Sequence, residues 1–273
     1  MHWDSKGRVA RPRPLTGLHF GAFPPNRSQM QIELNPAHDL TSLSQSYAAK
    51  KRLQIRNFFQ ADTAEEIYTE LHGLPWHLAF NEGSKVHEFS PEQLRSLPQQ
   101  RAAELRKTVD EGARAGFQFL YNHYPVFARY FANQERHRAI FKVYEFLNSP
   151  PMLDFFRKLT GLDEIRWADC HATLYQAGHF LKFHNDVNAS EQRLAAYVLN
   201  FTKTWDRDWG GLLEFWNAEG DAEFAYKPTF NALNIFTIPA DHSVSSVASY
   251  SPGLRFSVTG WLRGDNPPGR FPG

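Results

Sequence analysis

Two residues near the middle of the chain, His184 and Asp186, have the types and the spacing to bind a metal ion together. Side chains two residues apart on a β-strand point to the same face, so this pair would present an imidazole and a carboxylate side by side. A second imidazole from elsewhere in the chain would complete a site of two histidines and one carboxylate. Such a site leaves coordination positions of the metal open, which suits ferrous iron in oxygen-activating enzymes.

The His-x-Asp triplet is a weak signal by itself. The 12 His and 13 Asp of this 273-residue chain predict roughly 0.6 such triplets by chance. A second copy does occur, His2-Trp3-Asp4. It lies in a Pro- and Arg-rich terminus without a strand pattern, whereas His184 closes an alternating segment, so we discard His2 and keep His184.

His242 is the candidate for the second imidazole. The residues Pro239-Ala240-Asp241 interrupt an apolar run that resumes at 243–247, which places His242 at the start of a strand, where the mouth of a barrel lies. A lone histidine is more often a hydrogen-bonded surface or core residue. His242 therefore counts as a ligand only together with the partners at 184 and 186.

Arg255 is a candidate anion-binding residue. It stands between Leu254 and Phe256 in an otherwise apolar strand with no acidic neighbour in sequence. An unpaired internal charge would cost several kcal/mol, so a buried arginine here needs an anion. Its planar fork matches a carboxylate, and Ser257 on the same face can add a hydroxyl hydrogen bond. The alternative is a salt bridge to an Asp or Glu of the chain.

Size and composition predict a soluble globular protein. The chain is 42% hydrophobic, and its 23 Phe and 7 Trp suit a β-rich core. No run approaches the roughly 20 apolar residues of a membrane helix, and the N-terminus lacks the apolar core of a secretory signal, so we expect a cytoplasmic protein with no membrane association. Cys170, the one cysteine, is expected to be a buried apolar side chain, and a net charge of +1 favours no direct nucleic-acid binding.

The order of the elements predicts one catalytic domain at 32–263, between a flexible basic Pro/Arg-rich arm at 1–31 and a tail at 264–273. Within it, 32–161 is expected to be mostly helical support, with strand-like residues at 53–55 and 76–80 and a helix start at Asp62 and at Ser90-Pro91. From 162 onward the pattern changes to short strands between turn residues. These eight runs predict a double-sheet barrel or jelly roll with the helices on the outer face of one sheet: 164–175, 179–186, 193–201, 211–216, 222–227, 232–238, 243–248 and 254–262.

Five blocks of the second half resemble the 2-oxoglutarate- and iron-dependent oxygenases, specifically their prolyl-hydroxylase branch. The resemblance spans about 165–263 and agrees in order and spacing. The blocks are Tyr175-x-x-Gly178 up to His184-x-Asp186, Arg193 to Asn200, Trp209-Gly-Gly-x-Leu213, Pro239-x-x-His242, and Arg255-Phe-Ser257-Val-x-Gly-Trp261. The family fold is a double-stranded β-helix of eight core strands, which matches the strand count predicted above.

The resemblance also implies roles for individual residues. His184, Asp186 and His242 would bind Fe(II), with no further catalytic side chain. Arg255 would bind the distal carboxylate of 2-oxoglutarate with help from Ser257. Tyr175 and Tyr197 match family positions that bind the cosubstrate, although each is more often a core ring when taken alone. Trp205, Arg207 and Trp261 are candidates for the rim that contacts the substrate. The loop at 202–208, which carries two of them, is equally an ordinary solvated loop. His171 and His179 are off-pattern and expected to be structural.

The implied function is an Fe(II)- and 2-oxoglutarate-dependent dioxygenase that also uses O2, with ascorbate as a candidate reductant. It would hydroxylate prolyl residues of a protein or peptide and convert 2-oxoglutarate to succinate and CO2. Two alternatives stay open: the same chemistry on a free amino acid or other small molecule, and a barrel that binds a metal or carboxylate without turnover. The sequence does not give the oligomeric state.

Overall fold

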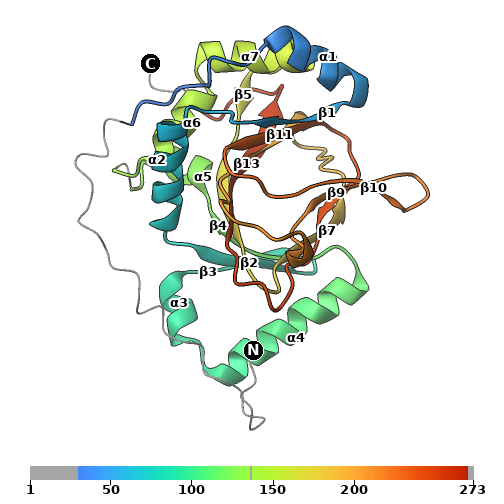
Figure 1. Ribbon diagram of the computed structural model, residues 1–273. Coiled ribbons are helices and arrows are strands. Elements are labelled where there is room, and N and C mark those ends of the chain that lie inside the picture. The colour runs from blue at the N-terminus through green and yellow to red at the C-terminus, as the bar shows by residue number, and fades with distance from the viewer. Residues whose placement is uncertain (1–29, 136, 270–273) are drawn as a thin grey trace.

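The structure, a computed structural model, describes residues 30–135 and 137–269 (Figure 1). The predicted arm at 1–31 lies outside the described residues except for its last two positions, and so does the end of the predicted tail, 270–273.

The eight strands predicted for the second half are all present and build a nearly closed barrel, which confirms the predicted fold class. Their order along the chain differs from their order in the sheet, so the barrel is built from crossovers rather than from consecutive hairpins. The strands are β6 (His171–Tyr175), β7 (Phe180–His184), β8 (Arg193–Asn200), β9 (Leu213–Trp216), β10 (Ala222–Tyr226), β11 (Ala232–Thr237), β12 (His242–Val244) and β13 (Arg255–Arg263).

Five further strands extend the sheet: β1 (Arg52–Arg56), β2 (His77–Glu82), β3 (Lys85–Phe89), β4 (Phe119–Tyr124) and β5 (Trp167–Ala168). The path of hydrogen-bonded strands is β1-β11-β8-β13-β6-β4-β7-β12-β9-β10, where β6 and β7 follow one another along the same edge of β4 and β2 pairs with its other edge. The two end strands approach each other at Arg52, which lies 3.1 Å from Glu223 and whose guanidinium lies 5.5 Å from the ring of Phe224. These contacts cover the backbone edges where the barrel does not close by hydrogen bonds.

Helices cover the outside of the barrel. In Figure 1, α1 and α7 lie along one end of the view, α2 and α6 along one side, and α4 along the opposite end. The helices are α1 (Leu40–Lys50), α2 (Ala61–His72), α3 (Pro91–Ser96), α4 (Gln99–Ala115), α5 (Val126–Phe131), α6 (Ile140–Leu147) and α7 (Pro150–Thr160). None of the described helices is long and apolar enough to span a bilayer.

The predicted cap at the start of α3 is present, whereas the predicted start at Asp62 lies two residues after Gln60, the actual N-cap of α2. Ser90 and Gln93 form a reciprocal capping box at α3, with Pro91 in the first turn, as predicted. Helix α2 begins at Ala61, so Asp62 lies inside its first turn and is not the cap. A carboxylate there still complements the positive end of the helix dipole.

The predicted mostly helical region at 32–161 contains two strands that the sequence analysis did not assign. Residues 85–89 form β3 and residues 119–124 form β4. The reason for β4 is tertiary: one of its edges pairs with both β6 and β7 and the other with β2, and the partners in β6 and β7 lie 48 or more positions away. Side chains of β4 alternate between the barrel interior and the layer under α4.

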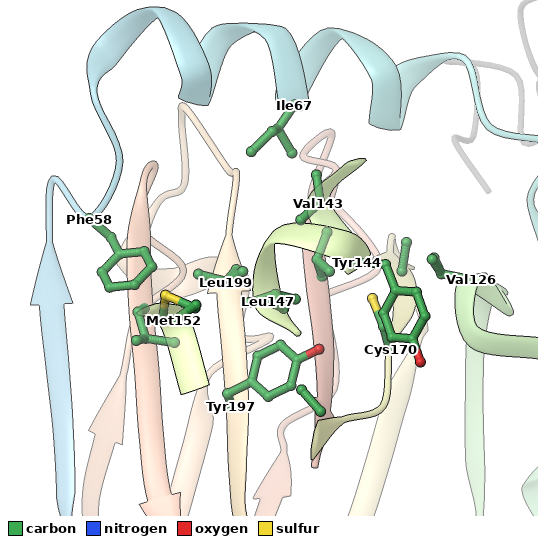
Figure 2. Packing of buried hydrophobic residues seen from close by; sticks show 14 of the residues in the cluster. Phe58, Ile67, Val126, Val143, Tyr144, Leu147, Met152, Cys170, Tyr197 and Leu199 are labelled. Atoms are coloured by element: carbon green, nitrogen blue, oxygen red, sulfur yellow. The ribbon is translucent and has the colours of Figure 1, made fainter. Parts of the chain in front are cut away.

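The main core lies between the barrel and the helices α1, α2, α6 and α7 (Figure 2). Its largest fully buried side chains are aromatic, and each contributes roughly 1.5–3 kcal/mol through burial. Cys170 is one of its members at 2% exposure, as predicted for a small apolar side chain. Figure 2 shows Tyr197 and Leu199 of β8 in the same layer as Val143 and Leu147 of α6.

The first residues of the predicted tail lie against the protein surface. Asp265 accepts hydrogen bonds from the Arg263 guanidinium at 2.7 and 2.9 Å, and its carbonyl accepts one from the Trp167 indole at 3.0 Å. Asn266 accepts a further bond from Arg166 at 2.8 Å. Residues 264–266 are therefore fixed to β13 and β5.

Candidate active site

His184, Asp186 and His242 meet at one end of the barrel. His184 ends β7 and His242 begins β12, and the two are direct register partners, with ring centroids 4.1 Å apart. Asp186 places one carboxylate oxygen 3.3 Å from His184 Nε2 and the other 3.4 Å from His242 Nε2. The three side chains offer donor atoms that all lie within 4.8 Å of one another, as metal ligands do.

The local geometry of this cluster differs from the one assumed in the sequence argument. Strand β7 ends at His184, and Asp186 lies two residues beyond it with a positive φ of 64°. The two side chains therefore do not share one strand face. A left-handed residue turns the chain back, which brings the carboxylate beside the imidazole.

The protonation of both imidazoles is set by the backbone. His184 Nδ1 lies 2.9 Å from the carbonyl of Lys182, and His242 Nδ1 lies 2.7 Å from the carbonyl of Ala240. A carbonyl only accepts, so each Nδ1 carries the proton and each Nε2 keeps its lone pair facing Asp186. Both rings are thus in the tautomer that binds a metal through Nε2.

The pKa values favour the same protonation states. Burial pushes the pKa of Asp186 upward, but interactions with the neighbouring His184 and His242 side chains more than offset this effect and lower the pKa to about 2. Burial lowers the pKa of His242 to about 4. At neutral pH the cluster is a carboxylate with a neutral imidazole, which are the forms that bind a cation.

Arg255 lies in the same barrel, toward its other end. The side chain is 2% exposed, and neither Nε nor one terminal nitrogen has a hydrogen-bond partner among the described residues. Its guanidinium lies 4.8 Å from the ring of Tyr175, its register partner on β6, and burial lowers its pKa. A buried cation with free donors and one aromatic ring beside it has the chemistry of an anion site.

A cavity of about 380 Å³ connects the cluster and Arg255. Ser257 and Thr173 lie between them on the wall, hydrogen-bonded to each other at 2.7 Å. Among the described lining residues Asp186 is the one acidic side chain. The other walls are mainly apolar, and they come from Phe119, Leu181, Ala196, Val198, Leu213, Phe236 and Val244.

The structure separates the two predicted cosubstrate tyrosines. Tyr175 lines the cavity, whereas Tyr197 is fully buried in the helix-covered core, where its hydroxyl donates to the carbonyl of Asp169 at 2.6 Å (Figure 2). The assignment of Tyr197 was wrong by one residue, because alternate residues of a strand face opposite sides. Its neighbours Ala196 and Val198 are the ones that line the cavity.

The predicted substrate rim is also divided. Trp261 lines the cavity near Asp186, with the Arg193 guanidinium 3.5 Å from its ring. Trp205 instead packs with Tyr175 at the Arg255 end, 6% exposed, and donates to the carbonyl of Gly210 at 2.8 Å. Arg207 is exposed in a short 3-10 turn (Arg207–Trp209) outside the cavity lining. The 202–208 loop thus closes the far end of the barrel.

One histidine of the cavity was missed by the sequence analysis. His171 was expected to be structural, yet it lines the cavity beside Trp261, and burial lowers its pKa to about 3, so its ring is neutral. The signal was present, because His171, Thr173 and Tyr175 have the same parity on β6. His179, by contrast, is buried and lies outside the cavity lining.

Comparisons with known proteins agree with this architecture. The model of a family described as the 2OG-Fe(II) oxygenase superfamily matches residues 170–263. Prolyl 3-hydroxylase OGFOD1 of Mus musculus is 24% identical over 218 residues, which cover 77% of this chain and 32% of that protein. The chain therefore spans about a third of the length of this curated relative.

Alignments with solved structures of the same fold cover most of each solved chain. A Pseudomonas putida prolyl-4-hydroxylase aligns with a TM-score of 0.53 at 18% identity over 82% of this chain and 98% of that one. A 2OG-Fe(II) oxygenase-family oxidoreductase from Burkholderia pseudomallei aligns with a TM-score of 0.54 at 13% identity over 86% of this chain and 97% of that one. A Trichoplax adhaerens prolyl hydroxylase in complex with a hypoxia-inducible-factor peptide fragment aligns with a TM-score of 0.50 at 13% identity over 82% of this chain and 88% of that one. These likenesses show a double-stranded β-helix.

The predicted resemblance to the prolyl-hydroxylase-like 2OG-Fe(II) oxygenases is therefore confirmed. The metal- and cosubstrate-binding roles of individual residues remain predictions. They are consistent with the positions of His184, Asp186, His242 and Arg255 in one cavity.

Proposed function

From the premise that residues 170–263 belong to the 2OG-Fe(II) oxygenase superfamily, we propose that the chain hydroxylates prolyl residues of a protein or peptide and converts 2-oxoglutarate to succinate and CO2. One observation carries this proposal: the buried guanidinium of Arg255, two of whose nitrogens have no partner among the described residues, shares a cavity with the His184, Asp186 and His242 cluster. A cation-binding set and an anion-binding group at opposite ends of one cavity fit a small diacid that also binds the metal.

The donor set fits ferrous iron. Two neutral imidazoles and one carboxylate would hold the ion, and iron bound there would supply the activation of O2. Arg255 would bind the distal carboxylate of 2-oxoglutarate, with the Ser257 hydroxyl beside it and Tyr175 packed against the guanidinium. The apolar walls exclude water, which strengthens these charge interactions and limits side reactions.

Arg193 holds the carboxylate ligand in place. Its guanidinium donates to the carbonyl of Asp186 at 3.3 Å and lies 3.9 Å from the carboxylate, while Glu191 accepts from it at 2.7 Å. The flat face of the Arg193 guanidinium packs against the ring of Trp261. Because Glu191 neutralises Arg193, this arginine orients Asp186 without competing for the negative charge that the metal needs.

The cavity favours an amide-linked substrate over a free amino acid. A free amino acid carries an ammonium group, and Asp186, the one acidic side chain among the described lining residues, faces both imidazoles. The ammonium group of a free amino acid would therefore stay unpaired in an apolar cavity, at a cost of several kcal/mol. A residue inside a peptide carries neither end charge. The mouse relative is named a prolyl 3-hydroxylase, and the Trichoplax prolyl hydroxylase was solved with a peptide fragment, which together support a prolyl residue in a peptide.

The test has two steps. Purified protein with ferrous iron and ascorbate, the reductant that keeps it ferrous, should release succinate from 2-oxoglutarate only when O2 is present. Incubation with a cell lysate should then add one oxygen atom to proline-containing peptides, as seen by mass spectrometry. Asp186→Ala is the matched inactive control. Succinate without any modified peptide would favour a small-molecule substrate, and no oxygen-dependent succinate would favour a binding-only barrel.

A further inference from the structure

An exposed aromatic ring stands at the mouth of the cavity. Phe117 is 49% exposed and lines the cavity, with its ring centroid 5.6 Å from that of His184 and 6.1 Å from that of Phe119. Val187, three residues after His184 in the chain, is 64% exposed and lines the same cavity. Large apolar side chains left in water around a cavity mouth are typical of a ligand contact.

The backbone on either side of Phe117 is fixed by buried amide groups. Gln118 Oε1 accepts from the backbone N–H of Asn81 at 3.2 Å, and Gln118 Nε2 donates to the Asn81 carbonyl at 2.8 Å. The Asn81 side chain in turn donates to the carbonyl of Phe117 at 3.2 Å. Both amide side chains are buried, so their hydrogen bonds are costly to break. The ring is therefore presented from a rigid segment.

A second link ties this segment to the strand that carries His184. Lys182 of β7 donates from Nζ to the carbonyls of Ala113 and Gly116 at 2.5 and 2.6 Å, at the C-terminal end of α4. A cation at this end satisfies free carbonyls and interacts favourably with the helix dipole. Lys182 stands two residues before His184, so the position of Phe117 is fixed relative to a predicted metal ligand.

We propose that Phe117 is a specificity-determining residue, whose ring packs against the uncharged five-membered ring of a proline within a peptide. The inference rests on the proposed function and adds the substrate contact to it. An aromatic face binds an apolar ring through burial and C–H contacts, and it offers nothing to a charged group that needs a hydrogen-bond partner. The exposed half of Phe117 then becomes buried when the peptide covers the mouth, which is the usual behaviour of an aromatic binding hot spot.

The test compares two synthetic peptide pools of random sequence, one with proline and one with alanine at a fixed central position. Binding to the full chain is measured by fluorescence anisotropy with Mn(II) and N-oxalylglycine, which replace iron and 2-oxoglutarate and prevent turnover. Wild type should bind the proline pool more tightly. Phe117→Ala should weaken that binding on the order of 10- to 100-fold and remove the preference, whereas Phe117→Tyr should retain it.

Phe224→Ala is the matched control, because Phe224 is also exposed, at 43%, but lies on β10 outside the cavity lining. It should leave both pools unaffected. Equal binding of the two pools by wild type, or an unchanged proline preference in Phe117→Ala, would overturn the inference. Succinate release without added peptide, measured on the same wild-type preparation, tells the two proposals apart. Its absence contradicts the proposed function, whereas succinate release together with no Phe117-dependent preference contradicts the role of Phe117 alone.

Discussion

Replacing Arg255 by methionine should remove the binding of 2-oxoglutarate without harming the fold. The guanidinium is 2% exposed, and two of its nitrogens have no partner among the described residues, so no internal hydrogen bond to them is lost in the variant. Methionine keeps much of the volume and removes a buried charge, a change that is often neutral or stabilising. The loss of the contact with the Tyr175 ring, 4.8 Å away, offsets part of that gain.

The magnitude follows from the hydrogen bonds that the diacid would make. Two bonds to a charged group contribute roughly 1.5–3 kcal/mol each, or about 3–6 kcal/mol together. At about 1.4 kcal/mol per factor of ten, the dissociation constant of the diacid should rise at least on the order of 100-fold. A ligand at 100 times its dissociation constant stabilises a protein by about 2.7 kcal/mol, and for a domain of this size that is a melting shift of roughly 5–10 °C.

The assay is thermal unfolding with Mn(II), with and without N-oxalylglycine. Wild type should show the full shift and Arg255→Met close to none at the same ligand concentration. Arg263→Met is the matched control on the same strand, because Arg263 is 6% exposed but paired with Asp265 at 2.7 Å and Asp169 at 3.3 Å. It should lower the melting temperature and keep the ligand shift. If Arg255→Met behaves like Arg263→Met, Arg255 is an internal salt-bridge residue and the anion site is wrong.

Three further outcomes follow from the geometry. Asp186→Ala should lose Mn(II) binding, measured by electron paramagnetic resonance, together with succinate release, because one of the three donors is gone. Tyr197→Phe should leave the 2-oxoglutarate requirement unchanged and destabilise the fold by about 1–3 kcal/mol in urea unfolding, since the carbonyl of Asp169 loses its donor. Tyr175→Ala should instead raise that requirement. Burial lowers the pKa of His179 from 6.5 to about 4, so the unfolded chain binds the proton more readily. Its contribution to stability is therefore complete above pH 6.5 and lost as the pH falls toward 4, and His179→Gln should flatten the pH dependence of unfolding over that window.

The sequence predicted what depends on local pattern. Each run of alternating residues after position 162 forms a strand, because the alternation of apolar and polar side chains within a segment indicates which of its faces is buried. His184 and His242 could be paired because each stands at a strand end next to turn residues. The error at Tyr197 shows the limit: a family block fixes the strand, but a shift of one residue exchanges the core face for the cavity face.

The first half was harder to predict because its decisive contacts are long-range. Strand β4 follows a 17-residue helix, and its residue Leu120 fits the apolar spacing of the preceding turns. Only the presence of β6 and β7, far along the chain, selects the extended form.

The position of β4 means that the family-matched segment cannot build the cavity by itself. One edge of β4 pairs with both β6 and β7, Asn122 with Leu174 and Phe119 with Leu181, while its other edge pairs with β2. Without β4, the strands that carry Tyr175 and His184 would present an unpaired edge. The first half of the chain thus supplies a wall of the site, and through Phe117 its mouth. The proposed role of Phe117 therefore assigns part of the substrate choice to residues outside 170–263, the segment that the family model matches.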